Sequence, residues 1–591
     1  MSAPISAVLG VEHSLTNKRW EASPADDRLA LALTQRHNLS DIVARILVAR
    51  GIDIDIAESF LNPSLKTLLP NPSLLKGMDQ ATDRIASAIV DGETIGVFGD
   101  YDVDGATSAA LLERFIHAVG GKVDIYVPDR LREGYGPNLP ALLQMKNAGA
   151  GVIITVDCGI TAFDPLAKAA DAGVDVVVVD HHAAEAKLPA AIAVINPNRI
   201  DDKSGQGQLA AVGVVFLLVV ALNRCLRERG HYTVRAEPNL LQWLDLVALG
   251  TVCDVVPLTG LNRAFVAQGL KVMARRDNIG LRALSDVASI AEAPTTYHAG
   301  YILGPRVNAG GRVGEAGIGA RLLTTNDADE ARDLAMRLDD WNNERRELEA
   351  TCLQEAILQA EMGGVREGLV YVSADDWHAG VIGIVAGRLK DSFNRPACVV
   401  ARNDGVGKGS GRSVSGIDLG AAVVAARQSG LLINGGGHPM AAGFTVSQES
   451  EEEFAKFLSN HIENQVGTEG VVRRLRIDAA VQPEGATTEL ALDLARIAPF
   501  GSGNPEPRFV LPAARIVKAD IVGENHVRCI LTGAMGGRLK AISFRSMGKP
   551  HGDALLNARG LPLHVAGYIR VDRWQGREEA QLIIEDVAAE S

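Results

Sequence analysis

The stretch VFGDYDVDGATSAAL, residues 97–111, places three aspartates at every second position, between an apolar run and a segment with the composition of a helix. Carboxylates this close together repel one another, and the repulsion costs free energy unless a cation, a proton or a hydrogen-bond donor offsets it. The stretch therefore predicts a turn from a strand into a helix, and it predicts a partner for the negative charge at that turn.

The sequence around this stretch alternates between two kinds of segment. Short runs rich in Val and Ile alternate with Ala-rich amphipathic segments between residues 94 and 200, and the runs are TIGVFG, VDIYVP, GVIITV, VDVVVV and IAVIN. This alternation is typical of a parallel sheet covered by helices. We therefore predict an α/β fold for this part of the chain.

Acidic and histidine residues follow several of these runs, in DYDVDG, DCG and DHH. Because the carboxyl ends of parallel strands share one edge of the sheet, where ligands bind, side chains far apart in the sequence can converge there. A further acid follows the apolar stretch in LGTVCDVVPL. The converging candidates are Asp100, Asp102, Asp104, Asp157, Asp180, His181, His182 and Asp254.

Carboxylate oxygens mixed with imidazole nitrogens suit Mn²⁺ or Mg²⁺ better than a thiolate-bound zinc ion. Two such ions side by side are a common means of hydrolysing phosphate esters. An isolated D-x-D is more often a turn or capping motif, but the conjunction of four acid-bearing segments favours a site for two divalent metal ions. Cys158 and Cys253 adjoin two of the proposed ligands, and we expect both to pack inward without a catalytic role.

Length and composition indicate a large globular protein. At 591 residues the chain is long enough for roughly three to five domains. Its longest apolar run, residues 209–222, is shorter than the roughly 20 residues that span a bilayer, so we interpret it as a buried helix. The N-terminus lacks the pattern of a secretory signal and the six cysteines form no C-x-x-C pair, so we expect a cytoplasmic protein with free thiols and no membrane association. The net charge of −13 decides little, because it leaves room for a local basic groove.

Changes in pattern along the chain predict five parts. They are an N-terminal helical lead-in over residues 1–75, a catalytic α/β domain over 76–325, a charged connector helix over 326–362, a smaller α/β domain over 363–465 and a β-barrel over 466–591. The barrel has the short strands of an oligonucleotide-binding fold, and its cations beside Phe544, Tyr568 and Trp574 suit a single strand. We expect the Gly-rich stretch at residues 300–317 not to be helical.

These motifs resemble those of the DHH phosphoesterase superfamily. DYDVDG, VDCG, VDHH and TVCDVVPL are similar to its ordered motifs, and GSGRS with GGGHPMAAG is similar to its DHHA1 companion domain. FLNPSL, GPRVNAGGR, WHAGVIGIVAGRLK and PFGSGNPEPRF extend the resemblance over nearly the whole chain, to the bacterial single-strand-specific exonucleases of the superfamily. The resemblance implies a parallel-sheet DHH domain, joined by the long helix to a smaller α/β DHHA1 domain and followed by an OB-fold-like barrel that binds nucleic acid.

The resemblance also implies roles for the converging residues. Asp102 and Asp104 would bind one metal ion each, either Mn²⁺ or Mg²⁺. Asp157 would bridge the two ions. His181 and Asp254 would complete the second site.

Two further residues have less defined roles in this resemblance. His182 would lie near the scissile phosphate and, with Asp157 and His181, would count as catalytic. Asp100 would either bind the first ion or orient its neighbours. Some distant members have a histidine five residues before the D-x-D, where this chain has Val97.

Phosphate groups of the substrate would be bound by cations and by glycine-rich backbone. In GSGRSVSG, the loop that the resemblance places at the 5′-terminal phosphate, Ser410 supplies a hydroxyl and Arg412 a bidentate guanidinium. The candidate substrate-binding residues are Arg130 or Arg132, Arg306, Asn308, Arg312, Ser410, Arg412 and His438.

The function implied is that of a single-stranded-DNA-specific exonuclease that degrades DNA 5′ to 3′ to mononucleotides, in DNA repair and recombination. Its partners would be single-stranded DNA and, beyond it, a helicase and a single-stranded-DNA-binding protein, and the chain would act as a monomer. Two alternatives stay open, a phosphodiesterase of short oligonucleotides or cyclic dinucleotides and a single-strand-binding scaffold without catalysis. The complete set of acids and histidines argues against the scaffold.

Overall fold

The structure is a computed structural model that describes residues 6–130, 132–366, 368–466, 472–558, 560–574 and 577–590. The chain divides into two compact units. Unit 1 comprises Met1–Leu68, Leu258–Arg263 and Val472–Ser591, and unit 2 comprises Leu69–Pro257 and Ala264–Val471.

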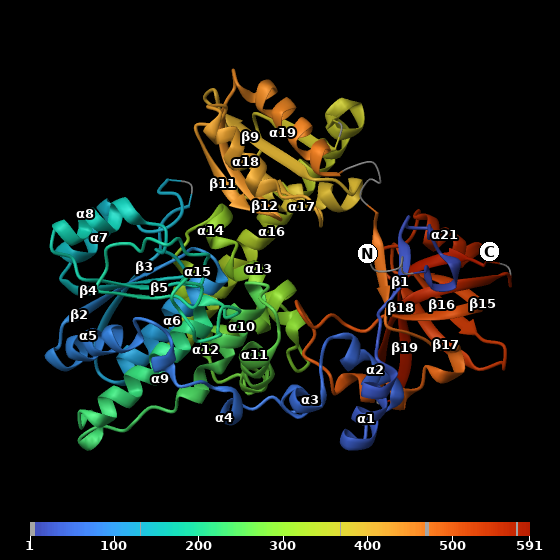
Figure 1. The fold of residues 1–591 in the computed structure, drawn as a ribbon, viewed down its shortest axis with the longest axis horizontal. Coiled ribbons are helices and arrows are strands. Elements are labelled where there is room, and N and C mark those ends of the chain that lie inside the picture. Colours follow the sequence, from blue (N-terminus) through green and yellow to red (C-terminus); the bar gives the residue numbers. More distant parts are fainter. Residues whose placement is uncertain are drawn as a thin grey trace. The chain divides into compact units, whose positions relative to one another are not determined.

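The first sheet of unit 2 is parallel and five-stranded, in the order β3-β2-β4-β5-β6 (Figure 1). Its strands are β2 (Thr94–Gly99), β3 (Lys122–Tyr126), β4 (Ala150–Val156), β5 (Val176–Val179) and β6 (Ala193–Ile195). They coincide with the five Val- and Ile-rich runs of the sequence, so the predicted parallel α/β fold is confirmed. Strands β4 and β5 are buried almost throughout, as expected for a sheet covered on both faces.

Helices cover both faces of this sheet. Helices α7 (Leu139–Asn147) and α8 (Phe163–Asp171) pack on one face, and α5 (Met78–Asp91), α6 (Val103–Ala118) and α9 (Ala211–Glu228) contact the sheet from the other. Helix α9 contains most of the longest apolar run and is buried along most of its length, which confirms that prediction. None of the helices in the described residues combines the length and the apolar composition that a membrane span needs.

The Gly-rich stretch after the sheet is helical, so the prediction for residues 300–317 is wrong. It forms the π-helical turn η5 (His298–Leu303) and the short helices α13 (Gly304–Val307) and α14 (Gly310–Val313). A Cβ atom on Gly304 would collide with the sulfur of Cys253, and one on Gly311 would collide with the carbonyl oxygen of Tyr101. These glycines therefore permit close packing of helices and do not mark a loop.

A long helix leads to the second sheet of unit 2. Helix α16 (Ala328–Gln359) begins at Asp327, whose side chain accepts hydrogen bonds from the backbone of Asp329 and Glu330. The second sheet has the order β11-β12-β10-β9-β8-β7. Its strands are β7 (Val365–Arg366), β8 (Leu369–Ala374), β9 (Ala397–Asn403), β10 (Val406–Arg412), β11 (Asn434–His438) and β12 (Ala441–Ser447).

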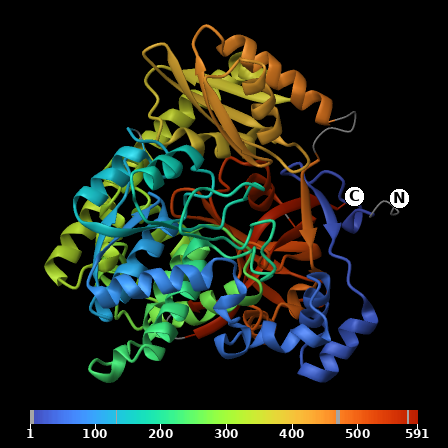
Figure 2. The same cartoon turned by 60° about the vertical axis from the view of Figure 1, so that its left-hand side comes forward.

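This second sheet also lies between two layers of helices. Helix α16 and helix α17 (Ile382–Phe393) share one apolar core with it, and α18 (Leu419–Gln428) and α19 (Glu451–Val466) share another. Figure 2 shows α19, in orange, running along this smaller domain. The predicted second α/β domain after a long helix is confirmed. The remaining helices of unit 2 are α10 (Leu244–Cys253), α12 (Ile279–Val287) and α15 (Ile318–Thr324), and α11 (Gly260–Met273) begins in the segment that clusters with unit 1.

Unit 1 contains a closed barrel. The strand order is β14-β15-β16-β17-β19-β18, and an additional pairing of β15 with β18 closes it. Its elements are β14 (Ala479–Ala480), α20 (Thr488–Ala495), β15 (Phe509–Val522), β16 (His526–Thr532), β17 (Arg538–Ser543), α21 (Pro550–Asn557), β18 (Pro562–Trp574) and β19 (Arg577–Ala589). The predicted OB-fold-like barrel is therefore confirmed.

The N-terminal helices belong to the same core as the barrel. Helices α1 (Asp27–His37), α2 (Asp41–Ala49) and α3 (Ile54–Leu61) share one buried apolar cluster with the barrel strands and α20, and α4 (Leu65–Leu68) follows them. Strand β1 (Arg19–Ala22) pairs in parallel with β13 (Arg474–Ile477), more than 450 residues later. Within β1, the buried Trp20 donates its indole N–H to Asp586 over 2.8 Å.

A buried arginine holds three segments of unit 1 together. Arg263 is 1% exposed, and its guanidinium donates to the carbonyls of Phe60, Ile497, Ala498 and Pro499. It also lies 3.8 Å from the centre of the Phe60 ring. Burial lowers the pKa of Arg263 to about 10, so the side chain remains a cation solvated by carbonyl dipoles.

We expect Arg263→Ala to lower the free energy of unfolding of unit 1 by about 3 kcal/mol, because several buried carbonyls lose their donor. Denaturant unfolding followed by tryptophan fluorescence measures this loss. The matched control is Arg275→Ala, which removes an exposed arginine close by in the sequence. Equal stability of the two variants would contradict the role assigned to Arg263.

Candidate metal centre and anion pocket

The turn from β2 into α6 carries the first three acids. Asp102 caps helix α6, and its Oδ1 accepts a hydrogen bond of 3.0 Å from the backbone N–H of Gly105. Gly105 is required there, because a Cβ atom would collide with the backbone of Asp100. Asp100 and Asp104 are 5% and 1% exposed, so the predicted strand-to-helix turn directs carboxylates into the protein.

Asp104 is held in place by the next helix. The backbone N–H groups of Ala211 and Val212, in the first turn of α9, donate to its two carboxylate oxygens over 2.6 and 2.9 Å. The amino-terminal end of a helix stabilises a negative charge. Each oxygen keeps a further lone pair, so Asp104 is fixed in orientation without being saturated.

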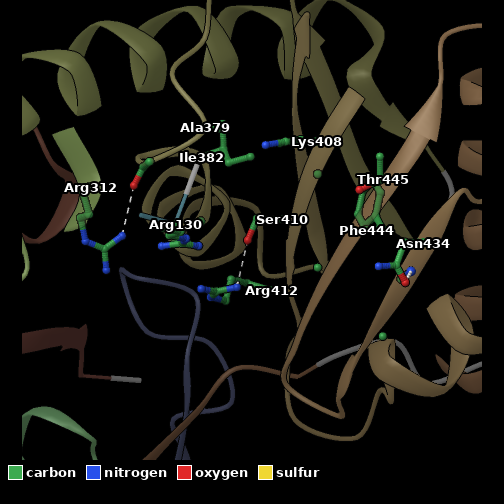
Figure 3. A pocket seen from close by; sticks show the side chains of 16 residues that line it. Arg130, Arg312, Ala379, Ile382, Lys408, Ser410, Arg412, Asn434, Phe444 and Thr445 are labelled. Atoms are coloured by element: carbon green, nitrogen blue, oxygen red, sulfur yellow. Dashed lines mark hydrogen bonds between the residues drawn. The ribbon is translucent and has the colours of Figure 1, made fainter. Parts of the chain in front are cut away.

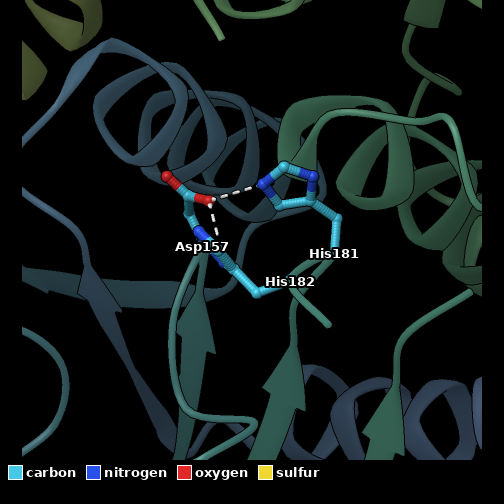
Figure 4. Close-up of side chains that lie close together, drawn as sticks. All are labelled: Asp157, His181 and His182. Atoms are coloured by element: carbon cyan, nitrogen blue, oxygen red, sulfur yellow. Dashed lines mark ion pairs between the residues drawn. The ribbon is translucent and has the colours of Figure 1, made fainter. Parts of the chain in front are cut away.

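Asp157 follows β4 and has a backbone φ of +61°, a value that residues other than glycine rarely adopt. This turn brings its Oδ1 to 3.3 Å from Nε2 of His181 and 3.9 Å from Nδ1 of His182, as Figure 4 shows. Strained backbone of this kind is typical of functional sites, where the surrounding structure maintains it. The three side chains come from the ends of two adjacent strands, β4 and β5, as predicted.

Asp180 supports the two histidines. Its side chain accepts hydrogen bonds from the backbone N–H groups of Ile160, His181 and His182, and it contacts Nδ1 of His182 at 2.8 Å. With four donors around it, Asp180 has little capacity left for a metal ion. The structure therefore places it behind the histidines, as the residue that orients them.

Asp254 follows a helix and not a strand, since it lies at the C-terminal end of helix α10. Its Oδ2 lies 3.6 Å from Nε2 of His181, which is also 3.9 Å from Oδ2 of Asp104. The ligand atoms form three overlapping groups, each within 4.8 Å. They are Asp100, Asp102 and Asp157, then Asp104, His181 and Asp254, and finally Asp157, His181 and His182.

Four carboxylates of this cluster are hard to ionise. Burial, together with the charges of neighbouring aspartates, raises the pKa of Asp100 and of Asp157 well above its ordinary value. The same two causes raise the pKa of Asp104 to about 7 and that of Asp254 to about 9. Without a cation, the cluster is therefore an arrangement of mutually repelling acids.

The two histidines have opposite electrostatics. Burial, and then the neighbouring His182, lower the pKa of His181 to about 4, so its ring is neutral and can act as a ligand. Burial also opposes a charge on His182, but the hydrogen bond to Asp180 and the charges of Asp180, Asp100 and Asp102 together outweigh it and raise the pKa. His182 is thus the one of the pair that favours the protonated form.

The unsatisfied atoms of the cluster fit divalent cations. Asp100 Oδ1, Asp157 Oδ1, His181 Nε2 and Asp254 Oδ2 are buried and have no hydrogen-bond partner in the described residues. Buried acceptors without donors are costly, and four of them facing one another are satisfied by cations. Oxygen atoms with one or two imidazole nitrogens suit Mn²⁺ or Mg²⁺.

The cysteines beside the cluster are free thiols that take no part in it. All six cysteines are unpaired, as predicted. Cys158 is fully buried, and the sulfur of Cys253 contacts the carbonyl of Ala299 at 3.5 Å. Burial raises the pKa of both thiols, so neither is a reactive thiolate.

A second site in unit 2 is a pocket of about 370 Å³ (Figure 3). Three of the predicted arginines line it, Arg130, Arg312 and Arg412, and so does Ser410. Arg412 donates to the hydroxyl of Ser410 over 3.2 Å. The structure thus brings together residues from the larger α/β domain and from strand β10.

The arginines of this pocket carry charge without a counter-ion. No ion pair within 4.0 Å joins Arg130, Arg312 or Arg412 to a carboxylate in the described part of the chain. Burial, followed by the repulsion of Arg130, lowers the pKa of Arg312 to about 10 and also lowers that of Arg412. An anion would therefore stabilise these three arginines, and phosphate is one of the anions that guanidinium groups bind through paired hydrogen bonds.

Four other candidates lie outside the pocket lining. Arg306 pairs with Asp339 over 2.8 Å, so its charge is used within the protein. Asn308 follows helix α13 and does not line the pocket, and His438 is exposed at the end of β11. Arg132 is exposed and lies near Asp129 at 3.6 Å.

The sequence analysis missed Lys408, Asn434 and Thr445, which line the same pocket. A signal for Lys408 is present in the sequence KGSGR, where polar side chains alternate with glycine. Alternate residues of a strand face the same side. Lys408 therefore shares the face of Ser410 and Arg412.

The barrel gives less support to its predicted DNA-binding face. Several of its cations pair with acids, as Lys518 does with Asp520 at 3.0 Å and Arg573 with Glu578 at 2.9 Å. Phe544 is half exposed, and Tyr568 lies beneath Arg508. The side chain of Trp574 lies outside the described residues. The orientation of these aromatics toward a strand stays a prediction.

The chain matches three family models. The DHH family, N-terminal domain, covers residues 94–251, the DHHA1 domain covers 366–464 and the RecJ OB domain covers 477–586. Fold and site together thus define a DHH-family protein with a DHHA1 domain and an OB barrel. The single-stranded-DNA-specific exonuclease RecJ of Bacillus subtilis is 33% identical over 96% of this chain and 71% of its own length, and that of Dickeya dadantii is 37% identical over 93% and 96%. The chain belongs to the RecJ family.

Solved structures agree with this assignment. The crystal structure of RecJ from Thermus thermophilus in complex with Mn²⁺ matches with a TM-score of 0.81 at 29% identity, over 96% of this chain and 79% of that chain. A structure of exonuclease RecJ bound to manganese matches with a TM-score of 0.57 at 34% identity, over 67% of this chain and 96% of that chain.

We expect Asp157→Asn to raise the melting temperature of the EDTA-treated protein at pH 8 by a few degrees. The raised pKa of Asp157 means that its ionised form destabilises the folded state above the pKa of the unfolded chain, and asparagine removes that charge. The same variant should lose most of the stabilisation that Mn²⁺ gives the parent protein. Differential scanning fluorimetry with and without Mn²⁺ measures both effects.

The matched control is Asp245→Asn, because Asp245 is equally buried and its pKa is raised to about 6, outside the metal cluster. This variant should keep its response to Mn²⁺. A normal response in Asp157→Asn would refute the assignment of Asp157 to the metal centre.

Proposed function

We propose that this protein is a metal-dependent exonuclease that degrades single-stranded DNA 5′ to 3′ to mononucleotides. One observation carries the proposal, the adjacency in unit 2 of a carboxylate–imidazole cluster and an arginine pocket without counter-ions. The two are linked at Tyr101, which lies between Asp100 and Asp102 in the sequence and whose ring lies 5.2 Å from the Arg130 guanidinium. A scissile phosphate at the carboxylate–imidazole cluster and a terminal phosphate in the arginine pocket would belong to the same strand.

The metal-binding residues would be Asp100, Asp102, Asp104, Asp157, His181 and Asp254. Two divalent cations, Mn²⁺ or Mg²⁺, supply a nucleophilic water at neutral pH and neutralise charge on the phosphate when bound there. Among the described carboxylates, Asp157 is the one that belongs to two of the three groups, which supports its proposed role as the bridging ligand. Asp100 shares a group with Asp102 and Asp157, so we assign it to the first ion, where Val97 supplies no ligand.

His182 is suited to act on the phosphate and not on the metal. Asp180 holds its ring at 2.8 Å and favours the imidazolium form, while the hydroxyl of Tyr135 lies 3.5 Å from the same nitrogen. A cation beside the scissile phosphate offsets the charge that develops there and can deliver a proton to the leaving 3′ oxygen. His181, with its neutral ring, has the complementary role of ligand.

The arginine pocket would determine polarity. Arg130, Arg312 and Arg412 would bind the 5′-terminal phosphate, and Ser410 would add a hydroxyl donor. A strand whose 5′ end is held there places its first internucleotide bond at the metal cluster. Cleavage then releases a 5′-mononucleotide and leaves a new 5′ phosphate on the shortened strand.

The cellular setting follows from the family. A role in DNA repair and recombination fits an enzyme that resects 5′ ends, and the single strand would come from a helicase and be coated by a single-stranded-DNA-binding protein. We place the protein in the cytoplasm as a monomer. Phosphodiesterases of cyclic dinucleotides need neither the barrel nor the N-terminal helices, which match RecJ relatives along most of their length.

We expect purified protein with Mn²⁺ to shorten a 5′-phosphorylated, 3′-labelled single strand progressively from its 5′ end. A blunt duplex of the same sequence should stay intact, because it cannot thread into a site for one strand. Sizing the products over time by denaturing gel measures both. Asp157→Ala and EDTA should each lower the cleavage rate by at least about 1,000-fold, because the variant lacks a carboxylate shared by two of the three candidate ligand groups and EDTA removes the cations.

The control variant for this assay is Asp245→Ala, which removes a buried acid outside the cluster. Cleavage of dinucleotides with an intact polymer would instead assign the protein to the small-substrate phosphodiesterases. Binding without any cleavage would make it a scaffold.

We expect Arg412→Ala to lower the preference for a 5′-phosphorylated strand over a 5′-hydroxyl strand by about ten-fold or more in kcat/KM, because one charge-assisted contact is worth about 1.5–3 kcal/mol. The preference is measured with two strands that differ only at the 5′ end. Arg402→Ala is the matched control, since Arg402 lies on the neighbouring strand β9 and pairs with Asp375 at 3.3 Å. An unchanged preference in Arg412→Ala would remove the pocket from end recognition.

A further inference from the structure

The arginine pocket is larger than one terminal phosphate requires. Its volume of about 370 Å³ equals that of roughly a dozen water molecules in the liquid, at about 30 Å³ each. A phosphate group has only five heavy atoms. The pocket thus has room for a chain of phosphate groups, provided that its remaining walls are polar and basic.

Strand β10 gives the pocket a basic wall that continues past the arginines. Lys408, Ser410 and Arg412 alternate with Gly407, Gly409 and Gly411, so the three polar side chains face the same side of the sheet. The distance along the strand from Arg412 to Lys408 is roughly 13 Å. Donors are therefore spaced along one line, with the Ser410 hydroxyl between the two cations.

The glycines make this line accessible. A Cβ atom on Gly409 would collide with the Phe444 ring, and one on Gly411 would collide with Leu419, so both glycines pack against the core behind the strand. Gly383, near the start of helix α17, lies on the pocket side of the strand. A Cβ atom on Gly383 would come very close to the side chains of Ser410 and Arg412. Backbone N–H groups at the start of a helix favour an anion in front of them.

The end of the pocket beyond Ser410 is lined by donors as well. Lys408, Asn434 and Thr445 lie there, away from Arg130 and Arg312 (Figure 3). The side-chain oxygen of Asn434 accepts the N–H of Gly435 at 2.8 Å, which leaves its amide nitrogen to donate elsewhere. No carboxylate lines the pocket.

The two ends of the pocket are ordered relative to the metal centre. Arg130 lies over Tyr101, and the charge of Asp102 acts on Arg312, so the arginine end is the one near the metal ligands. Lys408 lies at the opposite end of β10. A phosphate that belongs to the terminal nucleotide would therefore bind the arginines, and any further phosphate groups would extend toward Lys408.

We propose that this pocket admits a 5′-triphosphate end, so that the enzyme also degrades single strands that still carry the triphosphate of their first nucleotide. The proposal rests on the proposed exonuclease function and extends its substrate class. The α-phosphate binds the three arginines, and the β- and γ-phosphates lie along β10 between Ser410 and Lys408. Each added phosphate group brings negative charge that four cations in one pocket can match.

The first turnover then differs from all later ones. Water adds to the phosphorus of the second nucleotide, the bond from that phosphorus to the 3′ oxygen of the first nucleotide breaks, and the 3′ oxygen takes up a proton. The first product is a nucleoside 5′-triphosphate with a free 3′ hydroxyl. The shortened strand has an ordinary 5′ monophosphate, so every later product is a monophosphate.

The test compares three 3′-labelled single strands of one sequence that carry a 5′ hydroxyl, a 5′ monophosphate or a 5′ triphosphate. We expect the triphosphate strand to be degraded within about three-fold of the rate of the monophosphate strand, with one nucleoside triphosphate released per strand, detected by anion-exchange chromatography. Inorganic tripolyphosphate should also inhibit digestion of the monophosphate strand at lower concentration than orthophosphate does.

Lys408→Ala provides the structural check. It should lower the ratio of kcat/KM for the triphosphate strand to that for the monophosphate strand by about ten-fold, and Asn434→Ala should lower it by a smaller factor. Lys456→Ala, which removes an exposed lysine on helix α19 of the same domain, should leave the ratio unchanged.

A triphosphate strand that resists digestion while the monophosphate strand is degraded would overturn this inference and leave the exonuclease function intact. Resistance of all three strands would instead contradict the exonuclease function itself. A Lys408→Ala variant with the parental ratio would show that the far end of the pocket does not bind the additional phosphates, and would also overturn the proposal.

Discussion

The main physical constraint on this protein is the repulsion among carboxylates that are buried together at one edge of the parallel sheet. Asp100, Asp104 and Asp157 are almost inaccessible to solvent, and their ordinary charges cannot coexist there without cations. The fold maintains this unfavourable arrangement through secondary contacts. The first turn of α9 fixes Asp104, a strained turn fixes Asp157, and Asp180 fixes the histidines. This repulsion lowers the stability of the metal-free protein, and the same repulsion favours the binding of divalent cations.

The anion pocket shows the same principle with the opposite sign. Burial, together with the neighbouring guanidinium groups, lowers the pKa of Arg312 and Arg412, and no carboxylate lines the pocket in the described residues. In the proposed function, a strand of DNA would supply the missing charges to both sites, because its phosphates would bind the arginines and the cations that the acids would hold. The two unbalanced charge clusters would then account for the chemistry and for the polarity of the enzyme.

Unit 1 is organised by a different constraint. Its core combines N-terminal helices, a short segment from the middle of the chain and the C-terminal barrel, with Arg263 bonded to carbonyls from two of them. The parallel pairing of β1 with β13 also joins an N-terminal segment to a C-terminal one. The N-terminal segment, placed ahead of the catalytic domain in the sequence, is structurally a part of the barrel unit. Deletion of either end of the chain would therefore expose the apolar core of the other.

Much of the fold and of the metal centre could be predicted from local pattern, because the responsible forces act over short stretches. Val- and Ile-rich runs gave all five strands of the first sheet, and the acids after those runs converge as the geometry of a parallel sheet requires. The alternation of KGSGR contained a signal for Lys408 that the sequence analysis did not use. The glycines at residues 304–311 were misinterpreted, because glycine near a helix signals either a break or a close approach, and only the neighbours distinguish these.

Local sequence was enough to predict the strands, the turn at residues 100–105 and the chemical nature of the candidate metal ligands. Three features became visible in the folded chain alone: Asp180 supports the histidines, Arg306 pairs with Asp339, and the N-terminal helices share a core with the barrel. Backbone pattern and side-chain chemistry are properties of neighbouring residues. The partner of a charge or of an apolar face is set by packing between distant segments, so no local pattern contains it.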